Sequence, residues 1–376
     1  MRIGIDVRYL SHGILGGINS YLRNLLPALF EVAESHTIFL YADTKQPFEL
    51  EGLPGNVHLK LIPYQNAFSS FYYDFNMKKI MGLDKPDIVH FPGNYGFGPE
   101  GAKTVITLHD EINIMPLGKI LSGHPKNLRT VVNMTYLHFC SNAAVRKADL
   151  IVTISEYAKK QIERCGSLPD GKVKAIHHGR PLNVNRVEDV QEIEKVRLLY
   201  QIHKNFVLAD ALKNPGVLVR AWRLLPKEIR SDKEIVFFSR REDVWPEVHE
   251  AVKEGFAKLI IRPEREDLNT LYSMASVFVF PSWIEGFGIP LLEAMECGAP
   301  IIASDRGAIP EVLGEAGLII DAEDHQALAG CLERLFTQPE ERKRLIVKGF
   351  ERVRQFSWKD SATQLLEAYQ GLIENR

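Results

Sequence analysis

The amino-acid sequence predicts an α/β protein of two domains, each a parallel sheet covered on both faces by helices. Length is the first observation, because 376 residues exceed what one ordinary domain holds. The second is that short apolar segments alternate with segments of helical periodicity, as in doubly wound, Rossmann-like sheets. The third is a polar stretch at 181–204, which predicts a hinge. We therefore expect an N-terminal domain at 1–180 and a C-terminal domain at 205–355, facing each other across a cleft.

The N-terminal half contains apolar segments of strand length that are separated by helical segments. The first strand leads through a glycine loop at 13–17 into a helix whose apolar residues recur at helical spacing from Tyr21 to Phe30. Ser155 is predicted to cap a helix at 156–163. The strands are predicted at 3–6, 37–41, 87–90, 103–108, 150–154 and 173–176.

The C-terminal half repeats the alternation. A helix is predicted at 217–225, and Asp267 is predicted to cap another helix that runs through Met274. The strands are predicted at 206–208, 234–238, 258–262, 277–280, 300–303 and 318–320. Strands separated by helices favour right-handed parallel crossovers, so we expect ligands at the carboxyl ends of the strands.

Composition excludes several classes of protein. The formal net charge of −2 excludes a general nucleic-acid binder. No apolar run approaches the length of a membrane-spanning helix, and the N-terminus does not resemble a secretory signal. The four cysteines lie far apart without a CxxC motif, which disfavours a disulfide framework or zinc site. We therefore expect a cytoplasmic protein.

Basic residues flank an amphipathic stretch of the N-terminal half, at 124–129 and at 146–147. A basic amphipathic helix lies on a membrane surface in many peripheral proteins, whereas core packing is the simpler explanation of its apolar residues. Aromatic residues between 68 and 73 either line a groove for an acceptor or fill a core. The sequence leaves these alternatives open and allows a peripheral membrane contact.

The densest chemistry lies between residues 281 and 310. Gly286 and Gly288 allow the backbone to pass close to a bound group. Pro290 fits the first turn of a helix, and Gly298 fits its C-terminal cap. The helix should begin just after Gly288, where free backbone N–H groups favour an anion such as a diphosphate.

Two glutamates of this segment, Glu285 and Glu293, are eight residues apart. One is predicted in the loop and the other in the first helical turn, so both can face one ligand. Carboxylates accept hydrogen bonds from sugar hydroxyls but repel phosphate. The pattern indicates a ligand with an anionic centre and hydroxylated ends, as in a nucleotide sugar. The alternative is a capped helix with solvated glutamates.

The pair Glu285 and Glu293, with Glu285-Gly-Phe-Gly288 inside it, resembles the donor site of family-4 glycosyltransferases. The resemblance covers nearly the whole chain. Further similar segments are 3–8 with Gly16, Gly17 and Tyr21; 107–110 with Pro116; 148–155; 271–282; 310–312; and 356–358. It implies the GT-B fold, retention of anomeric configuration, and a C-terminal helix at 356–376 that crosses back to the first domain.

The resemblance also implies roles for residues of the second domain. Glu285 would lie near the hydroxyls of the donor sugar, and Glu293 would hold those of the ribose. Backbone amides of Phe287 to Ile289 would contact the sugar and the diphosphate. Lys213 would neutralise the leaving diphosphate.

In the first domain, the resemblance places His109 close to the transferred sugar. There the imidazole would donate a hydrogen bond to a sugar hydroxyl, or its backbone carbonyl would stabilise developing positive charge. A satisfied histidine at a strand end is the alternative. Gly16 and Gly17 would let the first domain approach the diphosphate.

The sequence departs from the family pattern before Lys213. Ala209 stands where relatives carry glycine, no arginine precedes the lysine, and Asp210 would repel a diphosphate if it pointed inward. Arg240 or Arg241 is predicted to supply the missing cation, since a guanidinium suits phosphate. If neither reaches the site, the donor would bind weakly or the enzyme would be degenerate.

The resemblance leads to a functional expectation. We expect a hexosyltransferase that moves a hexose from a nucleoside-diphosphate sugar, with GDP-mannose first, to a saccharide or lipid-linked saccharide hydroxyl in cell-surface polysaccharide synthesis. The sequence contains no Asp-x-Asp, so no essential metal and no cofactor are expected. The adjacent His177 and His178 would point to opposite faces of a strand, which disfavours a metal there. A non-catalytic nucleotide-sugar binder and, less favoured, a nucleotide-sugar epimerase are the alternatives.

Overall fold

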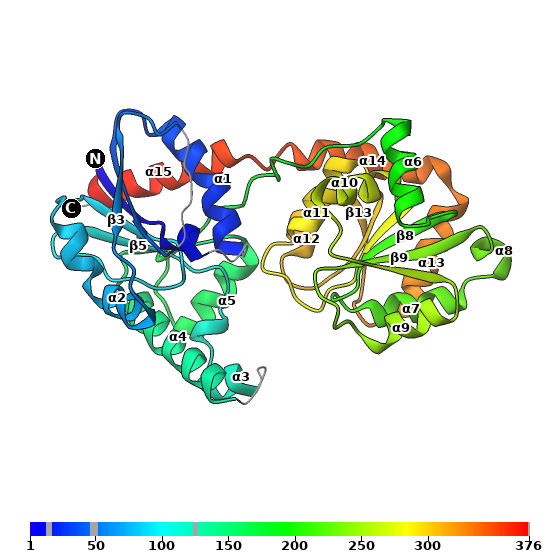
Figure 1. Cartoon of the computed structure of the whole chain (residues 1–376), viewed down its shortest axis with the longest axis horizontal. Coiled ribbons are helices and arrows are strands. Elements are labelled where there is room, and N and C mark those ends of the chain that lie inside the picture. Colours follow the sequence, from blue (N-terminus) through cyan, green and yellow to red (C-terminus); the bar gives the residue numbers. More distant parts are fainter. Residues whose placement is uncertain (13–16, 46–51, 123–126, 375–376) are drawn as a thin grey trace. The chain divides into compact units, whose positions relative to one another are not determined.

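The computed structural model describes residues 1–12, 17–45, 52–122 and 127–374. The chain divides into two compact units. The first contains Met1–Gly179 together with Ser357–Arg376, and the second contains Arg180–Phe356. Figure 1 shows both units as sheets covered by helices.

The first unit is built on a seven-stranded sheet in the order β3-β2-β1-β4-β5-β6-β7, with every pair parallel. Its strands are β1 (Arg2–Asp6), β2 (Thr37–Asp43), β3 (Val57–Ile62), β4 (Ile88–Phe91), β5 (Lys103–Thr107), β6 (Leu150–Thr153) and β7 (Val173–Ala175). The order reverses direction between β1 and β4, which is the switch point where ligands bind in open α/β sheets.

Helices cover both faces of this sheet. They are η1 (Arg8–His12), α1 (Gly17–Val32), α2 (Ala67–Gly82), η2 (Ile112–Ile114), α3 (Leu117–Ser122), α4 (Leu128–Lys147), α5 (Glu156–Gly166) and α15 (Trp358–Glu374). The Ser155 side chain accepts a hydrogen bond from the amide of Ala158, which confirms the predicted cap of α5.

The prediction for this unit missed β3. This strand pairs with β2 at the edge of the sheet, and the residues between its buried ends Val57 and Ile62 are exposed. An edge strand of this kind lacks the continuous apolar run that marks a strand buried on both faces.

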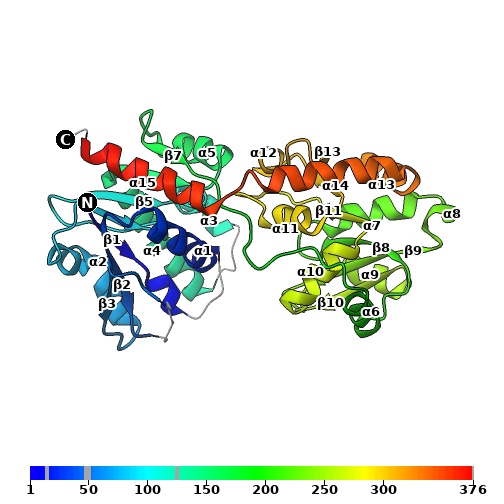
Figure 2. The same ribbon diagram turned by 90° about the horizontal axis from the view of Figure 1, so that it is seen from above.

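The C-terminal helix α15 belongs to the first unit and lies along α1 (Figures 1 and 2). Trp358, Leu365 and Tyr369 are buried in the same apolar core as α1 and β1. The Tyr369 hydroxyl contacts Nδ1 of the buried His90 at 2.6 Å, and His90 Nε2 lies 2.7 Å from Thr107 Oγ1. The predicted return of the C-terminal segment to the first domain is confirmed.

The second unit is built on a six-stranded parallel sheet in the order β10-β9-β8-β11-β12-β13. Its strands are β8 (Asn205–Asp210), β9 (Lys233–Ser239), β10 (Ala257–Ile261), β11 (Val277–Phe280), β12 (Ile301–Ser304) and β13 (Gly317–Ile320). This order is the Rossmann order, and each unit therefore has the predicted doubly wound architecture.

Nine helices of the second unit surround this sheet within the described residues. They are α6 (Val190–Leu199), α7 (Pro215–Leu224), α8 (Lys227–Arg230), α9 (Pro246–Lys253), α10 (Arg265–Met274), α11 (Ile289–Cys297), α12 (Ile309–Leu313), α13 (His325–Thr337) and α14 (Pro339–Val353). Across the described part of the chain, no helix is both long and apolar enough to cross a membrane.

Residues 181–204, predicted as a hinge, lie in the second unit and contain α6. Val196 is buried, and the Tyr200 hydroxyl donates a hydrogen bond of 2.6 Å to Asp267. The N-cap of α10 is Glu264, so the prediction that Asp267 caps this helix is wrong. Asp267 instead lies in the first turn and holds the end of α6.

Candidate active site

The carboxyl edge of the second sheet gathers most of the predicted site. β8 ends at Asp210, β9 at Ser239 and β11 at Phe280, and parallel pairing brings these ends to one edge. Lys213 and Glu285 lie in the loops that follow β8 and β11. Residues far apart in the chain are thereby brought together.

Lys213 and Glu285 form an ion pair in which Nζ lies 2.6 Å from Oε1. The Ser282 hydroxyl donates a hydrogen bond of 2.9 Å to the same carboxylate oxygen. The lysine side chain is 37% exposed and the glutamate side chain 15%, so the pair is open to solvent on the lysine side. The amine is therefore accessible to an incoming anion.

The loop that carries Glu285 is held by its backbone. The amide of Ala308 donates to the Glu285 carbonyl at 2.9 Å. Gly307 has a φ of +63°, and a Cβ there would lie 2.3 Å from the same carbonyl oxygen. Only glycine fits this approach. Sequence reasoning did not select Gly307, although a glycine soon after the buried strand β12 was the available signal.

The start of α11 follows the predicted pattern. Gly288 is the N-cap with a φ of +97°, Pro290 lies in the first turn, and Gly298 is the C-cap with a φ of +77°. The positive end of the helix macrodipole is thus beside the Glu285 loop. The Phe287 side chain is buried against Phe356, with ring centroids 5.8 Å apart.

Glu293 lies in the second turn of α11, so its predicted place in the first turn is wrong, and its side chain is buried and already engaged. Arg265 Nη2 donates to Oε1 at 2.8 Å, and the Tyr272 hydroxyl lies 3.3 Å from Oε2. Burial, with the charge of Glu293 adding to it, raises the pKa of Tyr272, which stays a neutral donor. Sequence reasoning missed Arg265, whose signal was a basic residue in the first turn of the helix after β10.

The structure shows where the two residues that depart from the family pattern, Ala209 and Asp210, are located. Ala209 is buried in β8 between Val279 and Phe237, and the Asp210 carboxylate accepts a hydrogen bond of 2.8 Å from the Leu212 amide. Burial raises the pKa of Asp210, and the charges of Lys213 and Arg240 oppose that shift.

Both candidate arginines are exposed, and of the two it is Arg240 whose charge acts on Asp210. The amide of Arg241 donates to Ser239 Oγ at 3.0 Å. Asn214, next to Lys213, adopts a φ of +53° and donates to the carbonyls of Pro281 and Ala322 at 2.9 and 2.8 Å. Sequence reasoning gave Asn214 no role, yet it ties the lysine loop to the end of β11.

In the first unit, His109 follows β5 and is held by the loop after β4. Its amide donates to Asn94 Oδ1 at 3.2 Å, and its Nε2 lies 3.0 Å from the carbonyl oxygen of Pro92. A carbonyl only accepts, so Nε2 carries the proton. In this tautomer of the neutral ring, Nδ1 is a hydrogen-bond acceptor.

The surroundings of His109 keep it uncharged. Its ring meets Tyr21 edge-on at 5.3 Å between centroids, and Tyr21 also contacts His178 and Trp358. Burial lowers the pKa of His109 to about 4, and burial with the charge of His109 lowers that of His178 to about 3.

Of the two glycines predicted to approach the diphosphate, Gly16 and Gly17, the structure describes one. Gly16 lies outside the described residues, whereas Gly17 begins α1, and among the described residues no atom lies within 4 Å of the position that a Cβ would take there.

Two Rossmann-ordered units, with a C-terminal helix that returns to the first, form the architecture of GT-B glycosyltransferases. Residues 15–184 match the family described as Glycosyltransferase Family 4, and residues 205–338 match Glycosyl transferases group 1. The two matched ranges together cover most of the chain, which therefore belongs to the family-4 glycosyltransferases, as the resemblance implied.

Two bacterial mannosyltransferases are similar to this chain in sequence. The O-antigen chain mannosyltransferase B of Escherichia coli is 29% identical over 294 residues, which are 76% of this chain and 75% of that protein. The serotype-specific mannosyltransferase WbdA of Escherichia coli is 27% identical over 73% of this chain. The match spans 34% of WbdA, so the chain covers about a third of that longer protein.

Among solved structures, Anabaena HepE in complex with UDP-glucose superimposes with a TM-score of 0.69. The match covers 99% of this chain and 100% of HepE at 17% identity. At this identity, the likeness shows the fold.

Proposed function

We propose that this chain is a retaining mannosyltransferase that transfers mannose from GDP-mannose to a hydroxyl of a saccharide or lipid-linked saccharide. The proposed setting is cell-surface polysaccharide synthesis, in the cytoplasm at the inner face of the membrane. The similarity to O-antigen chain mannosyltransferase B supports the sugar and the pathway class.

The observation that carries the proposal is the Lys213–Glu285 ion pair beside the start of α11. It places a cation, a helix N-terminus and a carboxylate together, which matches a sugar joined to a diphosphate. On donor binding, Lys213 exchanges part of its contact with Glu285 for a phosphate oxygen. Glu285 then accepts hydrogen bonds from sugar hydroxyls.

The chemistry proposed at this site breaks the bond between the anomeric carbon and the phosphate oxygen. The electron pair stays on the diphosphate, where Lys213 and the α11 amides stabilise the added charge. The acceptor oxygen bonds to the anomeric carbon on the same face, and its proton passes to the leaving phosphate oxygen. Configuration is retained because attack and departure use one face.

The nucleoside end has its own partners in the second unit. Glu293, oriented by Arg265 and Tyr272, is proposed to hold the ribose hydroxyls. A carboxylate held from two sides loses little conformational freedom on binding, which favours affinity. Arg240 supplies a second cation near Asp210, so the diphosphate is proposed to bind without an essential metal.

His109 is proposed to contact the transferred sugar as a neutral group. Because its Nε2 proton is directed at the Pro92 carbonyl, Nδ1 is suited to accept a hydrogen bond from a sugar hydroxyl. This refines the expectation that the side chain donates. A neutral ring also avoids repelling the positive charge that develops on the sugar.

A thermal-shift panel tests the donor proposal with GDP, UDP, GDP-mannose and UDP-glucose, each with and without magnesium. A ligand that binds the native state raises Tm by mass action. We expect a shift with GDP and GDP-mannose that does not need magnesium. A shift confined to uridine nucleotides would overturn the donor, and one that requires magnesium would overturn metal independence.

Product analysis separates the catalytic alternatives. Transfer of mannose to a mannose-terminated acceptor with an α-linkage supports a retaining transferase. Binding without turnover would identify a non-catalytic nucleotide-sugar binder. Conversion of the nucleotide sugar without acceptor would identify an epimerase.

A further inference from the structure

An apolar groove lies between α2 and α4 of the first unit. Its volume is about 510 Å³. The lining residues come from the two helices and from the loop after β4, and they are Phe71, Phe75, Phe97, Val131, Val132, Thr135, Tyr136, Phe139, Cys140 and Ala143. This is the stretch for which the sequence left core packing and a surface role open.

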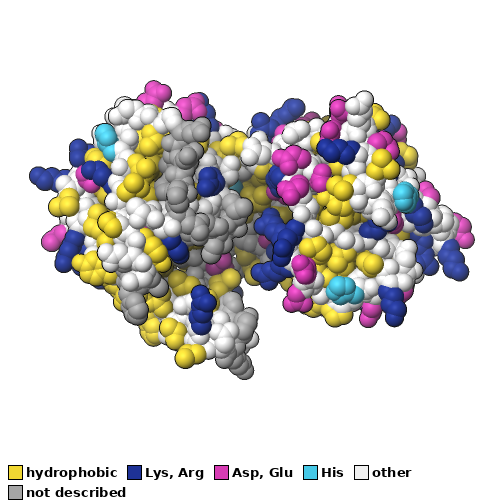
Figure 3. Space-filling model, in the orientation of Figure 1, with side chains coloured by type: hydrophobic (Ala, Val, Ile, Leu, Met, Phe, Trp, Pro, Cys, Tyr) yellow, Lys and Arg dark blue, Asp and Glu magenta, His cyan; other side chains and the backbone are white. Residues whose placement is uncertain are grey.

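The groove opens onto solvent. Phe71, Val132 and Phe139 expose 52%, 56% and 63% of their surface, so these side chains do not complete a core. Figure 3 shows hydrophobic side chains at the surface of the first unit in the region of α2 and α4. Contiguous exposed apolar surface of this kind marks an interaction site.

The exposed charged residues on the helices around the groove are mostly basic, which favours an anionic partner. The helices α2, α3 and α4 carry six basic residues, all of them exposed: Lys78, Lys79, Lys119, Arg129, Arg146 and Lys147. Their sequences contain one acidic residue, Asp74. Lys147 Nζ lies 5.8 Å from the ring centroid of Phe97, at the margin of the groove.

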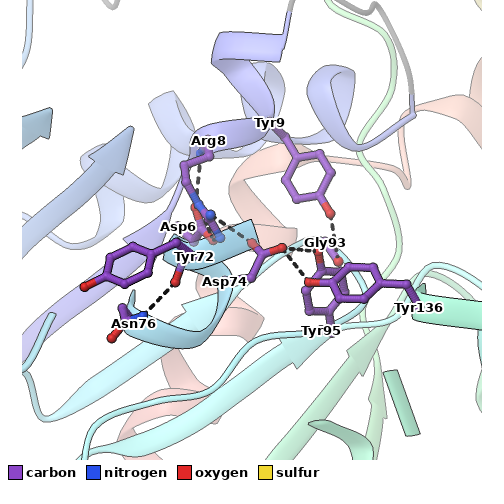
Figure 4. A network of polar contacts seen from close by, with 9 residues as sticks. All are labelled: Asp6, Arg8, Tyr9, Tyr72, Asp74, Asn76, Gly93, Tyr95 and Tyr136. Atoms are coloured by element: carbon purple, nitrogen blue, oxygen red, sulfur yellow. Dashed lines mark hydrogen bonds and ion pairs between the residues drawn. The ribbon is translucent and has the colours of Figure 1, made fainter. Parts of the chain in front are cut away.

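Asp74 does not offset this charge, because it is turned inward. Its carboxylate accepts hydrogen bonds from Arg8 Nη1 at 2.9 Å, Tyr95 at 2.9 Å and Tyr136 at 2.7 Å. Figure 4 shows Asp74 between Arg8 and the two tyrosines. The network fixes both walls of the groove to the carboxyl edge of the sheet.

We propose that the face formed by α2, α3 and α4 docks on an anionic phospholipid bilayer. The exposed aromatic and aliphatic side chains would enter the headgroup region, and the basic residues would contact lipid phosphates. Charge complementarity favours this occupant over a second copy of the chain, which would bring basic helices together. The proposal deepens the function proposed above by naming the surface that meets the membrane.

Docking would also fix the position of His109, the candidate sugar-binding residue of the first unit, relative to the membrane. Tyr95 follows Asn94, which holds the His109 amide, and both Tyr95 and Tyr136 bond to Asp74. The groove and the candidate sugar-binding His109 are therefore connected through hydrogen bonds and the neighbouring residues Asn94 and Tyr95. A membrane-bound acceptor would reach His109 at a constant height above the bilayer.

Flotation of the full chain with vesicles tests the proposal without donor or turnover, so its outcome is independent of the proposed reaction. We compare vesicles of phosphatidylcholine alone with vesicles that also contain phosphatidylglycerol. Binding is expected to the anionic vesicles and to fall with added salt. The double variant Phe71→Ser/Phe139→Ser and the double variant Arg146→Gln/Lys147→Gln should each bind roughly tenfold more weakly.

Matched control variants lie in the second unit. Trp245→Ser removes an exposed aromatic residue and Lys343→Gln an exposed cation, and both should bind like wild type. Thermal melts establish that each variant is folded. The proposal is overturned if the wild type does not float, if it binds neutral vesicles equally well, or if the four substitutions have no effect. A dimer in light scattering that Phe139→Ser dissociates would assign the groove to self-association and also overturn it.

Discussion

Each unit carries ion pairs at the carboxyl edge of its sheet, but the two sets differ in exposure. In the first unit, Arg8 pairs with Asp6 and Asp74, and its side chain is 12% exposed. In the second unit, Lys213 pairs with Glu285, and its side chain is 37% exposed. The same kind of interaction thus serves two purposes, because a buried pair fixes the fold and an accessible pair can exchange partners.

The pKa values in the first unit support this division. Burial lowers the pKa of Arg8, but the charges of Asp6 and Asp74 outweigh it, so the guanidinium stays charged. The buried histidines His90, His109 and His178 of the same unit are instead kept neutral by burial, which lowers the pKa of each. Of the two sets of ion pairs at the sheet edges, the accessible one therefore lies in the second unit, where the proposed reaction creates negative charge on a leaving group.

The largest expected effect on stability comes from the buried pair. Arg8→Met should lower the free energy of unfolding by about 3–5 kcal/mol, because it leaves two buried carboxylates without their cation. Chemical denaturation measures this loss. Donor affinity of the folded fraction should be unchanged, and a loss of affinity with stability intact would break the comparison.

The accessible pair should show the reverse behaviour. Lys213→Met should lower turnover by about 10²- to 10³-fold, because a preorganised cation at the leaving group is lost. Its Tm should stay near that of the wild type, since an exposed pair contributes about 1 kcal/mol or less. Initial rates with GDP-mannose measure the effect, with Lys343→Met as the matched control. Unchanged turnover would remove Lys213 from the mechanism.

Most strands were predictable because parallel strands buried on both faces appear as apolar runs. The Glu285–Glu293 segment was predictable because its glycines, proline and carboxylates are contiguous. Arg265, Asn214 and Gly307 were not, because each acts on a distant segment. Asn214, for example, bonds to Ala322 across 108 positions. No local pattern encodes such a contact before the strand order is known.

A smaller effect is expected from acid. Burial, with the charge of His109, lowers the pKa of His90 to about 3, below its ordinary value of 6.5. The unfolded chain therefore binds the proton more readily, and the stability that neutral His90 contributes is lost as the pH falls from 6.5 towards 3. The slope approaches about 1.4 kcal/mol per pH unit for one such group.

The variant His90→Gln should flatten the dependence of Tm on pH, whereas a change at the exposed His203, His203→Gln, should preserve it. Thermal melts across this pH range give both slopes. Equal slopes in wild type and His90→Gln would show that His90 is not kept neutral by the fold.

The smallest expected effect is on the pH profile of turnover. Because the pKa of His109 is about 4, its neutral form persists through the range where an ordinary histidine titrates. Turnover attributed to this group should stay level around pH 6.5 and decline only towards about 4. A decline centred near 6.5 that disappears in His109→Asn would show an ordinary, exposed imidazole.

Calorimetric titration with GDP-mannose tests the central claim, which is that the charged residues Lys213, Glu285 and Glu293 of the second unit bind the donor. We predict binding to the wild type without magnesium, weakened roughly tenfold or more in Glu293→Gln, where a charged hydrogen-bond acceptor is lost. Glu315→Gln, at an exposed glutamate paired with Lys348, should bind like wild type. Equal affinity in all three proteins, or no binding to any, would contradict the account.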